Sequence, residues 1–397
     1  MKQGWEIKIL DDVCTFERGL TYAKGDEVNI SSKGVLRSNN VDLSTNTLNF
    51  DEIKYLREDF EIPAKKKVRK NSLLMCISNG SKIHLGKVAL IDDDIDYAFG
   101  GFMGLLIPDE TIIHPRYFYY SLISPMYKSF VKGLSDGANI NNLKFADIKS
   151  FSIAVPPLAE QERIVGILDK EFERIDALKV NAEQNLQHAK DLFQSALKQE
   201  LHPKEGWVSK TVGEVCTLKS GNSNANNSSI GTLPFVKVGD MNIQGNEEEI
   251  TCSTMYVSRE ENIRGIFPIG SVIFPKRGGA ILTNKKRITA TEICCDLNIM
   301  GVYSNGDVIP NLLYFYFLGV DLSEIYNGAA IPQINNGDIA PLNISFPKEI
   351  VEQQNIVDKL NSLKLSCKVL EENYTKTIAL CDDMKQALLR KAFNGEL

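Results

Sequence analysis

At residues 155–165 the chain reads VPPLAEQERIV, and the kind of sequence changes at this point. Pro156 and Pro157 end a β-type run, because proline has no amide hydrogen to donate to a strand ladder. Glu160 and Glu162 then place negative charge in a first helical turn, where it suits the helix dipole. About 40 residues follow with no proline and many strong helix formers. The stretch therefore predicts the end of a compact domain and the start of a long helix.

An apolar seam runs along this predicted helix in steps of three and four residues, or in whole multiples of them. Its members are Ile164, Leu168, Ile175, Leu178, Ala182, Ala189, Leu192 and Ala196, and the set 192 positions later is Ile356, Leu360, Cys367, Leu370, Tyr374, Cys381, Met384 and Leu388. A seam that repeats every 3.5 residues predicts a coiled coil. The alternative is two amphipathic helices, each lying on its own domain. Each helix would be roughly 60 Å long, which is more than one small domain needs.

The rest of the chain is also present twice. The offset between the copies shrinks from 202 residues at Gly4-Trp5 and Gly206-Trp207 to 199 at Asn71–Leu74 and Gly270–Ile273, 197 at Met103-Gly104 and Met300-Gly301, 194 at Asn141-Asn142 and Asn335-Asn336, and 192 at Glu160-Gln161 and Glu352-Gln353. A drifting offset indicates small deletions in loops between two copies of one fold, not a short-period solenoid. A duplicated module suits a target that is itself bipartite.

These observations predict four segments: a domain at 1–157, a helical region at 158–202, a second domain at 203–347 and a second helical region at 348–397. Each domain reads as α+β, because short β-type runs alternate with turn residues and one aromatic helix begins at Pro115 or Pro310. The run 97–108 is expected to be a buried strand interrupted by glycine. If a pseudo-twofold axis relates the halves, the two long helices pair as an antiparallel coiled coil and the arrangement is circular.

The composition is that of an ordinary globular protein, with 397 residues, 43% apolar and 24% charged residues, and a net charge of −6. No apolar run approaches the ~18–20 residues of a membrane span, and the N-terminus has no signal-peptide pattern. Eight cysteines include no CxxC pair and only four histidines accompany them, which argues against a zinc site. We therefore expect a cytoplasmic, multidomain protein with reduced thiols.

Four fragments of the sequence resemble the specificity (S) subunits of type I restriction–modification systems: PPLAEQERIV at 156–165, KEGW at 204–207, NSLLMCISNGSKIHLGKVALID at 71–92 and KQALLRKAFNGEL at 385–397. The resemblance covers the whole chain in the order recognition domain, helix, recognition domain, helix. The second junction departs from the pattern, since residues 346–357 read FPKEIVEQQNIV. That change makes the start of the second helix less certain, but not the family.

The resemblance implies a DNA-recognition subunit with no catalytic activity of its own. Each domain would read one half of an interrupted site in double-stranded DNA, and the helices would set the gap between the halves. Two methyltransferase subunits, which use S-adenosylmethionine to methylate adenine, would dock on the helices, and motor-nuclease subunits would join them in a prokaryotic cytoplasm. No cofactor is expected on this chain. The docking and coiled-coil residues would be Glu160, Gln161, Ile164, Leu168, Ile175, Leu178, Glu352, Gln353, Ile356, Leu360, Leu370 and Leu388.

The residues themselves also argue against catalysis. Adenine methylation would need an Asn/Asp-Pro-Pro-aromatic motif, and Val155-Pro156-Pro157-Leu158 lacks both the polar and the aromatic member. The glycines of 80–87 are wrongly spaced for a phosphate-binding loop. Asp92-Asp93-Asp94 could hold a metal ion, but adjacent carboxylates after a strand more often form a solvated loop. Four scattered histidines supply a general acid–base site poorly.

DNA contacts need Lys and Arg for phosphates, and Arg, Asn, Gln, Ser and Thr for base edges. The candidate residues are Lys65, Lys66, Lys67, Arg69, Lys70, Ser78, Asn79, Ser81 and Lys82 in the first domain, and Asn222, Asn224, Asn226, Lys276, Arg277, Lys285, Lys286 and Arg287 in the second. A charge run is often only a solvated face. Here Lys276 and Arg277 align with the turn at 76–81, which the family presents toward DNA. The loops at 137–142 and 328–336 recur in both copies, as structural turns or as base readers.

Two other classes of protein compete with DNA recognition. In a protein-interaction scaffold, two globular heads would bind proteins and the coiled coil would only space them. The unequal basic clusters of the two domains argue weakly against this class, and a gel shift would discriminate strongly. An enzyme, such as a fused modification protein, would need the methyltransferase or nuclease motifs that the sequence lacks.

Overall fold

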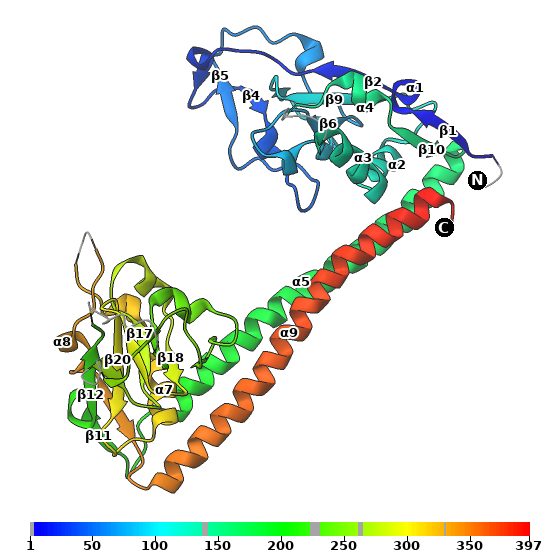
Figure 1. Cartoon of the computed structure of the whole chain (residues 1–397). Helices are drawn as coiled ribbons and strands as arrows, with labels where there is room; N and C mark the ends of the chain where they lie inside the picture. The colour runs from blue at the N-terminus through cyan, green and yellow to red at the C-terminus, as the bar shows by residue number, and fades with distance from the viewer. Residues whose placement is uncertain (1–3, 137–141, 223–230, 261–264, 329–330) are drawn as a thin grey trace. The chain divides into compact units, whose positions relative to one another are not determined.

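The structure is a computed structural model that describes residues 4–136, 142–222, 231–260, 265–328 and 331–397. The chain divides into two units. Unit 1 comprises Met1–Ala182 with Lys376–Leu397, and unit 2 comprises Glu183–Thr375. Each unit contains one α+β repeat together with a part of both long helices, which confirms the predicted fold class (Figure 1).

Two small sheets form the repeat of unit 1. The main antiparallel sheet has the order β2-β9-β6-β7, with β2 (Cys14–Arg18), β9 (Met103–Pro108), β6 (Leu73–Cys76) and β7 (Val88–Leu90). The second sheet has the order β3-β5-β4-β8, with β3 (Glu27–Val28), β5 (Lys54–Leu56), β4 (Lys33–Leu36) and β8 (Ala98–Phe99). Strand β6 is buried on both faces, since Leu73 and Met75 join one core cluster and Leu74 and Cys76 another. This explains its continuous apolar sequence.

Four helices accompany these sheets: α1 (Leu10–Val13), α2 (Pro115–Leu122), α3 (Pro125–Asp136) and α4 (Phe145–Lys149). The aromatic helix α2 starts with Pro115 in the first turn, as predicted, and packs against β7. Its side chains Tyr117 and Phe118 are buried in the main core.

Unit 2 repeats this plan. Its main sheet has the order β12-β20-β17-β18-β14, with β12 (Cys216–Ser220), β20 (Ile299–Ser304), β17 (Val272–Pro275), β18 (Arg287–Thr289) and β14 (Glu249–Ile250). The second sheet has the order β15-β13-β19-β16, with β15 (Tyr256–Val257), β13 (Leu233–Val236), β19 (Ile293–Cys295) and β16 (Ile266–Phe267). Its helices are α6 (Val212–Val215), α7 (Pro310–Gly319) and α8 (Asn336–Ile339), and α7 packs against β17, β18 and β20.

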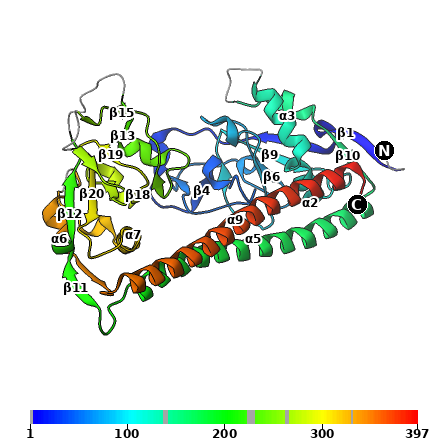
Figure 2. The ribbon, with the colours of Figure 1, turned by 60° about the horizontal axis from the view of Figure 1, so that its bottom comes forward.

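A two-stranded ribbon joins each repeat to its following helix. In unit 1, β1 (Glu6–Ile9) pairs with β10 (Ser152–Val155) (Figure 2). In unit 2, β11 (Val208–Thr211) pairs with β21 (Asn343–Phe346). The last strand of each repeat therefore returns to the first, next to the prolines that precede the long helix.

Strand pairing corrects two of the sequence matches between the repeats. Cys14 faces Pro108 and Cys216 faces Ser304, so the offset along β9 and β20 is 196 residues and Met103 corresponds to Ile299, not to Met300. Likewise the amide of Leu143 donates to Ile77 O at 2.7 Å, and that of Ile334 donates to Lys276 O at 2.9 Å. The offset there is 191 residues. The repeated Met-Gly pairs are thus displaced from each other in the fold, and Asn142 corresponds to Gln333, not to Asn336.

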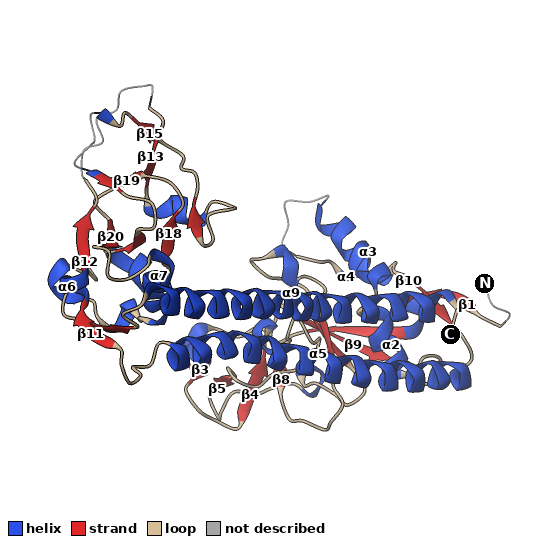
Figure 3. Ribbon diagram, turned by 90° about the horizontal axis from the view of Figure 1, so that it is seen from below, coloured by secondary structure: helices blue, strands red, loops and turns tan. Residues whose placement is uncertain are grey.

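The two long helices are α5 (Leu158–Glu200) and α9 (Ile350–Asn394), with 43 and 45 residues (Figure 3). In unit 1 the first part of α5 runs antiparallel to the last part of α9, because Asp176 pairs with Lys385 and Lys179 with Asp382. In unit 2 the last part of α5 meets the first part of α9, where Glu200 pairs with Lys359. No helix in the described ranges is both long and apolar enough to cross a membrane.

Only part of the predicted seam is buried. Leu168, Ile175, Ala182 and Ala189, seven residues apart, are almost inaccessible. Leu360, Cys367 and Cys381, the counterparts on α9 of Leu168, Ile175 and Ala189, are buried too, whereas Tyr374 is half-buried. The intermediate positions differ from the prediction, since Leu178 is 46% exposed and Leu370 38% exposed, and Leu192 and Met384 are exposed as well. Two helices alone cover one narrow stripe of each other, so one position in each heptad is left facing solvent.

Candidate nucleic-acid interface

A polar turn follows strand β6 and is held by two neighbouring loops. The amides of Ile77 and Ser78 both donate to Phe102 O, at 3.0 and 3.1 Å. Asn79 Nδ2 donates to Ser38 Oγ at 2.8 Å, and Asn79 Oδ1 accepts from the amide of Ser81 at 2.9 Å. The turn is therefore fixed to the loop after β4 and to the loop between β8 and β9. Three of the predicted DNA-contacting residues, Ser78, Asn79 and Ser81, lie together here.

More cationic and polar groups border this turn. Lys82 Nζ donates to Ser135 O at 3.0 Å, which connects the turn to the end of α3. Ser78 forms an isolated β-bridge with Asn142. The aliphatic part of Arg37 lies over the loop between β8 and β9, since a Cβ on Gly100 would be 3.6 Å from Arg37 Cγ. We call the surface formed by Arg37, Ser78, Asn79, Lys82 and Phe102 the reading edge of unit 1.

The basic run 65–70 does not form one patch. Lys67 is engaged in an ion pair with Asp96, and Lys66 Nζ donates to Arg18 O near the end of β2. Lys65 is exposed beside them, whereas Arg69 and Lys70 precede β6 and so lie at the opposite end of that strand from Ser78. Lys65 and Lys66 stay predictions as phosphate contacts near the reading edge, and Arg69 and Lys70 are separated from it.

In unit 2 the equivalent turn carries Lys276 and Arg277. Lys276 Nζ donates to Ser220 Oγ at 2.8 Å, and burial, followed by the charge of Arg277, lowers the pKa of Lys276. Arg277 is exposed. Arg277 forms an isolated β-bridge with Gln333, as Ser78 does with Asn142. The candidate Asn222 is exposed after β12, and its amide donates to Cys295 O at 2.9 Å. The candidates Asn224 and Asn226, most of the recurring loop 137–142, and part of 328–336 lie outside the described residues.

The second basic run of unit 2 is largely internal, which corrects its prediction as a DNA face. Lys286 is only 2% exposed, and its Nζ donates to Asn284 Oδ1 and Val320 O, both at 2.5 Å. Arg287 donates to Asn246 O and to two further backbone carbonyls, and burial lowers its pKa. Lys285 Nζ donates to Asn242 Oδ1. The ammonium group of Lys286 and the guanidinium of Arg287 thus donate hydrogen bonds to neighbouring loops, which offsets the free-energy cost of burying a cation.

The two repeats present different side chains on one hydrogen-bonded frame. The amide of Lys276 donates to Asn298 O at 2.8 Å, as that of Ile77 donates to Phe102 O. Phe102 therefore corresponds to Asn298, and Ser78 to Arg277. In the second sheet, the first residue after β4 is Arg37 in unit 1, and the first residue after β13 is Lys237 in unit 2. The frame is shared, and the chemistry that it offers to a ligand is not.

A lysine-lined groove of about 510 Å³ lies between the turn at 82–84 and helix α3. Lys82, Lys87, Lys128 and Lys132 line it, together with the exposed apolar residues Leu43 and Ile83. Burial lowers the pKa of Lys128, although Asp382 opposes the shift. The described part of unit 2 has no helix equivalent to α3. The sequence reasoning missed Lys128 and Lys132, for which their four-residue spacing on one helix face was an available signal.

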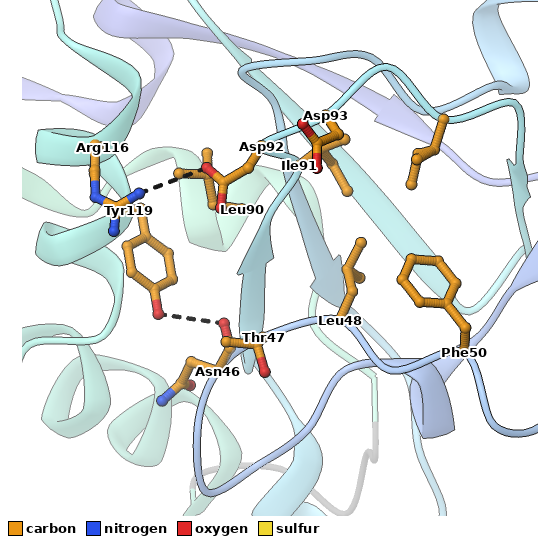
Figure 4. A pocket seen from close by; sticks show the side chains of 11 residues that line it. Asn46, Thr47, Leu48, Phe50, Leu90, Ile91, Asp92, Asp93, Arg116 and Tyr119 are labelled. Carbon is orange, nitrogen blue, oxygen red and sulfur yellow. Dashed lines mark hydrogen bonds and ion pairs between the residues drawn. The ribbon is translucent and has the colours of Figure 1, made fainter. Parts of the chain in front are cut away.

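A second cavity, of about 300 Å³, lies beside the acidic loop 92–94 (Figure 4). Arg116 Nη1 is 3.7 Å from Asp92 Oδ1, and Arg116 Nε donates to Asp169 on α5 at 2.7 Å. Tyr119 Oη donates to Asn46 O at 3.2 Å. The carboxylates of Asp92 and Asp93 make this cavity unsuitable for a DNA phosphate. Within the described ranges no group of three His, Cys, Asp or Glu side chains could hold a metal ion.

Gln161 and Gln353 have an internal role that differs from the predicted subunit docking. Both are fully buried. Gln161 Oε1 accepts from the amide of His114 at 2.8 Å, and its Nε2 donates to Ile112 O and Pro156 O. Gln353 accepts from the amide of Ile309 and donates to Asp307 O and Pro347 O, all at 2.9 Å. Each glutamine thereby fastens a long helix to the start of the aromatic helix of its own repeat.

The other predicted helix residues are divided between core and surface. Ile164, Leu168 and Leu388 pack into the core of unit 1, and Ile356 and Leu360 into that of unit 2. Glu160 forms an ion pair with Arg163 at 2.7 Å, and Glu352 is exposed. The docking candidates that remain on the surface are therefore Glu160, Glu352, Leu178 and Leu370.

Comparisons with known proteins agree with this duplicated architecture. A family model described as the type I restriction modification DNA specificity domain matches residues 2–188 and again 204–379. The type I restriction enzyme StySPI specificity subunit of Salmonella potsdam is 27% identical, over 100% of this chain and 90% of its own length. The EcoKI specificity subunit of Escherichia coli K12 is 25% identical over the same shares.

Two solved structures share the fold. A chain from a study of complex assembly and conformational transition of the type I restriction–modification system has a TM-score of 0.81 at 20% identity, covering 100% of this chain and 99% of its own. The HsdS subunit from Thermoanaerobacter tengcongensis has a TM-score of 0.61 at 20% identity, covering 100% of this chain and 98% of its own.

Proposed function

Since the chain belongs to the type I restriction–modification DNA specificity family, it is a DNA specificity subunit, and we propose that each repeat reads one half of a bipartite DNA site. The observation that carries this proposal is the shared frame with exchanged side chains, Ser78 and Phe102 in one repeat and Arg277 and Asn298 in the other. Equal frames suit two equivalent approaches to DNA. Unequal side chains suit two different half-sites, because sequence is read by side chains at base edges.

We further propose that α5 and α9 set the gap between the half-sites. Both helices are continuous through 43 and 45 residues. Inserting one heptad into each helix, after Ala182 and after Tyr374, would add about 10 Å, or roughly 3 base pairs at 3.4 Å each. A modified site with an unchanged gap would contradict this role.

Methyltransferase subunits are the proposed partners of the exposed heptad positions. Leu178 and Met384 belong to unit 1, and Leu192 and Leu370 to unit 2, so each unit offers one exposed apolar stripe, formed by a leucine and a methionine in unit 1 and by two leucines in unit 2. Packing of a partner helix on each stripe would bury it, which is the usual driving force for such association. Leu178→Glu and Leu192→Glu should each reduce binding of the methyltransferase subunit in pull-down and gel filtration, whereas Glu61→Gln, at an exposed position outside both long helices, serves as a surface control.

Catalysis belongs to these partners in our proposal. Methyl transfer from S-adenosylmethionine to adenine would take place on the methyltransferase subunits, and DNA cleavage on motor-nuclease subunits, in a prokaryotic cytoplasm. The sequence of this chain supports a non-catalytic role, since it lacks the Asn/Asp-Pro-Pro-aromatic motif that would hold an adenine amine.

The test is methylome sequencing of a methylation-free host that expresses this chain with the methyltransferase subunit encoded beside it. We expect methyladenine in a split motif, with two short halves around an unread gap. If the two proteins co-purify and the DNA carries no methylation, the assembly does not recognise DNA in this way. The interaction scaffold would then become the better description.

A further inference from the structure

Phe102 is placed at the reading edge of unit 1 in an unusual state for an aromatic residue. Its side chain is 70% exposed, whereas most large apolar side chains of this repeat are buried. The backbone around it is fixed, since Phe102 O accepts two amides of the polar turn and the amide of Met103 donates to Gly100 O at 2.8 Å. Leaving this ring in water forgoes the free energy of burying it. A rigid loop that exposes an aromatic ring in this way suits a ligand that covers it.

The same position in unit 2 is polar and satisfied. Asn298 is half-buried, and its Nδ2 donates to Asp296 Oδ2 at 3.0 Å. The frame itself therefore does not require an apolar side chain at this position. The exposed ring is a property of the first repeat, which is the expected pattern for a residue that serves one half-site and not the other.

The surroundings of Phe102 indicate the chemistry of the ligand. The loop that carries Phe102 adjoins polar and cationic residues, because the Phe102 carbonyl accepts the amide of Ser78 and a Cβ on Gly100 would be 3.6 Å from Arg37 Cγ. Within the described residues, the buried Nε of Arg37 has no hydrogen-bond partner. An exposed apolar side chain on a loop that adjoins hydrogen-bonding and cationic residues fits a nucleobase with its phosphates better than it fits an apolar protein surface. Apolar side chains contact DNA in two ways, against the thymine methyl group or as wedges between stacked bases.

We propose that Phe102 makes the apolar base contact of the half-site read by the first repeat. This inference rests on the proposed function, because it presupposes that the repeat reads DNA. Phe102 supplies the apolar contact, while the polar groups beside it supply hydrogen bonds and phosphate contacts. The second repeat, with Asn298 and Arg277 at the matching places, reads its half-site through polar contacts.

The experiment uses the full chain in complex with its methyltransferase subunit and the DNA site defined by methylome sequencing. Affinity is measured for Phe102→Ala, for Phe102→Trp and for the matched control Asn298→Ala, on the cognate site and on single base-pair variants. We expect Phe102→Ala to weaken cognate binding at least tenfold and to lose discrimination at one or two adjoining positions of one half only. Phe102→Trp should keep most of the affinity, and Asn298→Ala should affect only the other half.

Modified DNA separates the two kinds of apolar contact. If the ring packs on a thymine methyl, replacing that thymine by uracil should weaken the wild-type complex and leave Phe102→Ala unchanged. If the ring wedges between bases, 2-aminopurine at that step should brighten on binding the wild-type complex and stay quenched with Phe102→Ala. Either result supports a base contact.

Two outcomes would overturn the inference while leaving the proposed function intact. In the first, Phe102→Ala binds the cognate site within twofold of wild type, with every position still discriminated. In the second, Phe102→Ala no longer co-elutes with the methyltransferase subunit, which would make the ring a protein contact. Failure of the wild-type complex to prefer any site would instead contradict the proposed function itself.

Discussion

The two repeats of this chain resemble each other most where they are buried and least where their turns face solvent. Gln161 and Gln353 make the same three kinds of hydrogen bond to the same kinds of backbone group. On the turn after β6 and β17, by contrast, Ser78 is replaced by Arg277, and on the adjoining loop before β9 and β20 Phe102 is replaced by Asn298. A comparison inside one chain thus separates residues that build the frame from residues that use it.

The glutamines give the strongest test of the shared frame. Gln161→Leu leaves one amide and two carbonyls buried without partners, so we expect a loss of roughly 3 kcal/mol in the free energy of unfolding. Gln353→Leu should cost about the same. Urea unfolding of both variants checks this, with Glu352→Gln as an exposed control. A cost confined to one repeat would break the equivalence.

Arg277 and Ser78 test the difference between the turns. Arg277→Ala should weaken cognate DNA binding about 30-fold, because a bidentate arginine contact to a base is worth ~1–3 kcal/mol. Ser78→Ala, at the matching position, should change affinity less than threefold. Fluorescence anisotropy with the assembled complex measures both. Equal losses would mean that the two turns contact DNA in the same manner.

Helix α3 sharpens the comparison, since the described part of unit 2 has no such helix. Replacing Lys128 and Lys132 together by glutamine should weaken binding about tenfold on every sequence and reduce the salt slope of log K by about 2, as expected for two lost phosphate contacts. Salt titrations on cognate and random DNA provide the measurement. A loss restricted to the cognate site would instead indicate base contacts.

The smallest expected effect is a pH dependence of unit 2. Burial lowers the pKa of Lys286 to about 8, below its ordinary value of 10.5, so the folded state binds fewer protons than the unfolded state between these pH values. The stability penalty is therefore full below pH 8 and is relieved as pH rises toward 10.5. We expect the free energy of unfolding to rise by about 1 kcal/mol over this pH range, because the two oxygen acceptors of the Lys286 ammonium group offset part of its burial cost.

Lys286→Met should remove this pH dependence. The strand register places Val88 at the corresponding position of the first repeat, and the buried lysine of unit 1 is its neighbour Lys87, whose pKa burial also lowers, so a smaller pH response from unit 1 should persist in the variant. Urea unfolding at pH 7.5 and pH 10 tests both statements. An equal pH response in the wild type and the variant would show that another group titrates.

The sequence predicted the duplication, the α+β repeats and the long helices, because glycine, proline and apolar spacing respond directly to backbone geometry. The sequence-based prediction was wrong where the same type of side chain can be either buried or exposed. The basic run with Lys286 and Arg287 predicts a DNA-contacting face, although tertiary contacts bury Lys286 and commit Arg287 to backbone carbonyls. Phe102 lies in the apolar run 97–108, which predicted a buried strand, and only the turn at Gly100 and Gly101 brings its ring outward. Periodicity also cannot detect an amide group such as that of Gln161, whose partners are backbone atoms.

Unit 1 includes the last part of α9, which is made at the end of the chain, and this has a consequence for synthesis on the ribosome. The core of the first repeat is completed by Leu389, Ala392 and Phe393, and the ring of Phe393 lies 5.1 Å from that of Tyr117. At about 5–20 residues per second, translation reaches these residues roughly 10 to 40 s after it leaves α5. During that interval the nascent first repeat exposes an unfinished apolar surface. A chain terminated before Leu389 would keep the turns after β6 and β17 and still lack a finished first repeat. Protein quality control could then remove it before it selected any DNA.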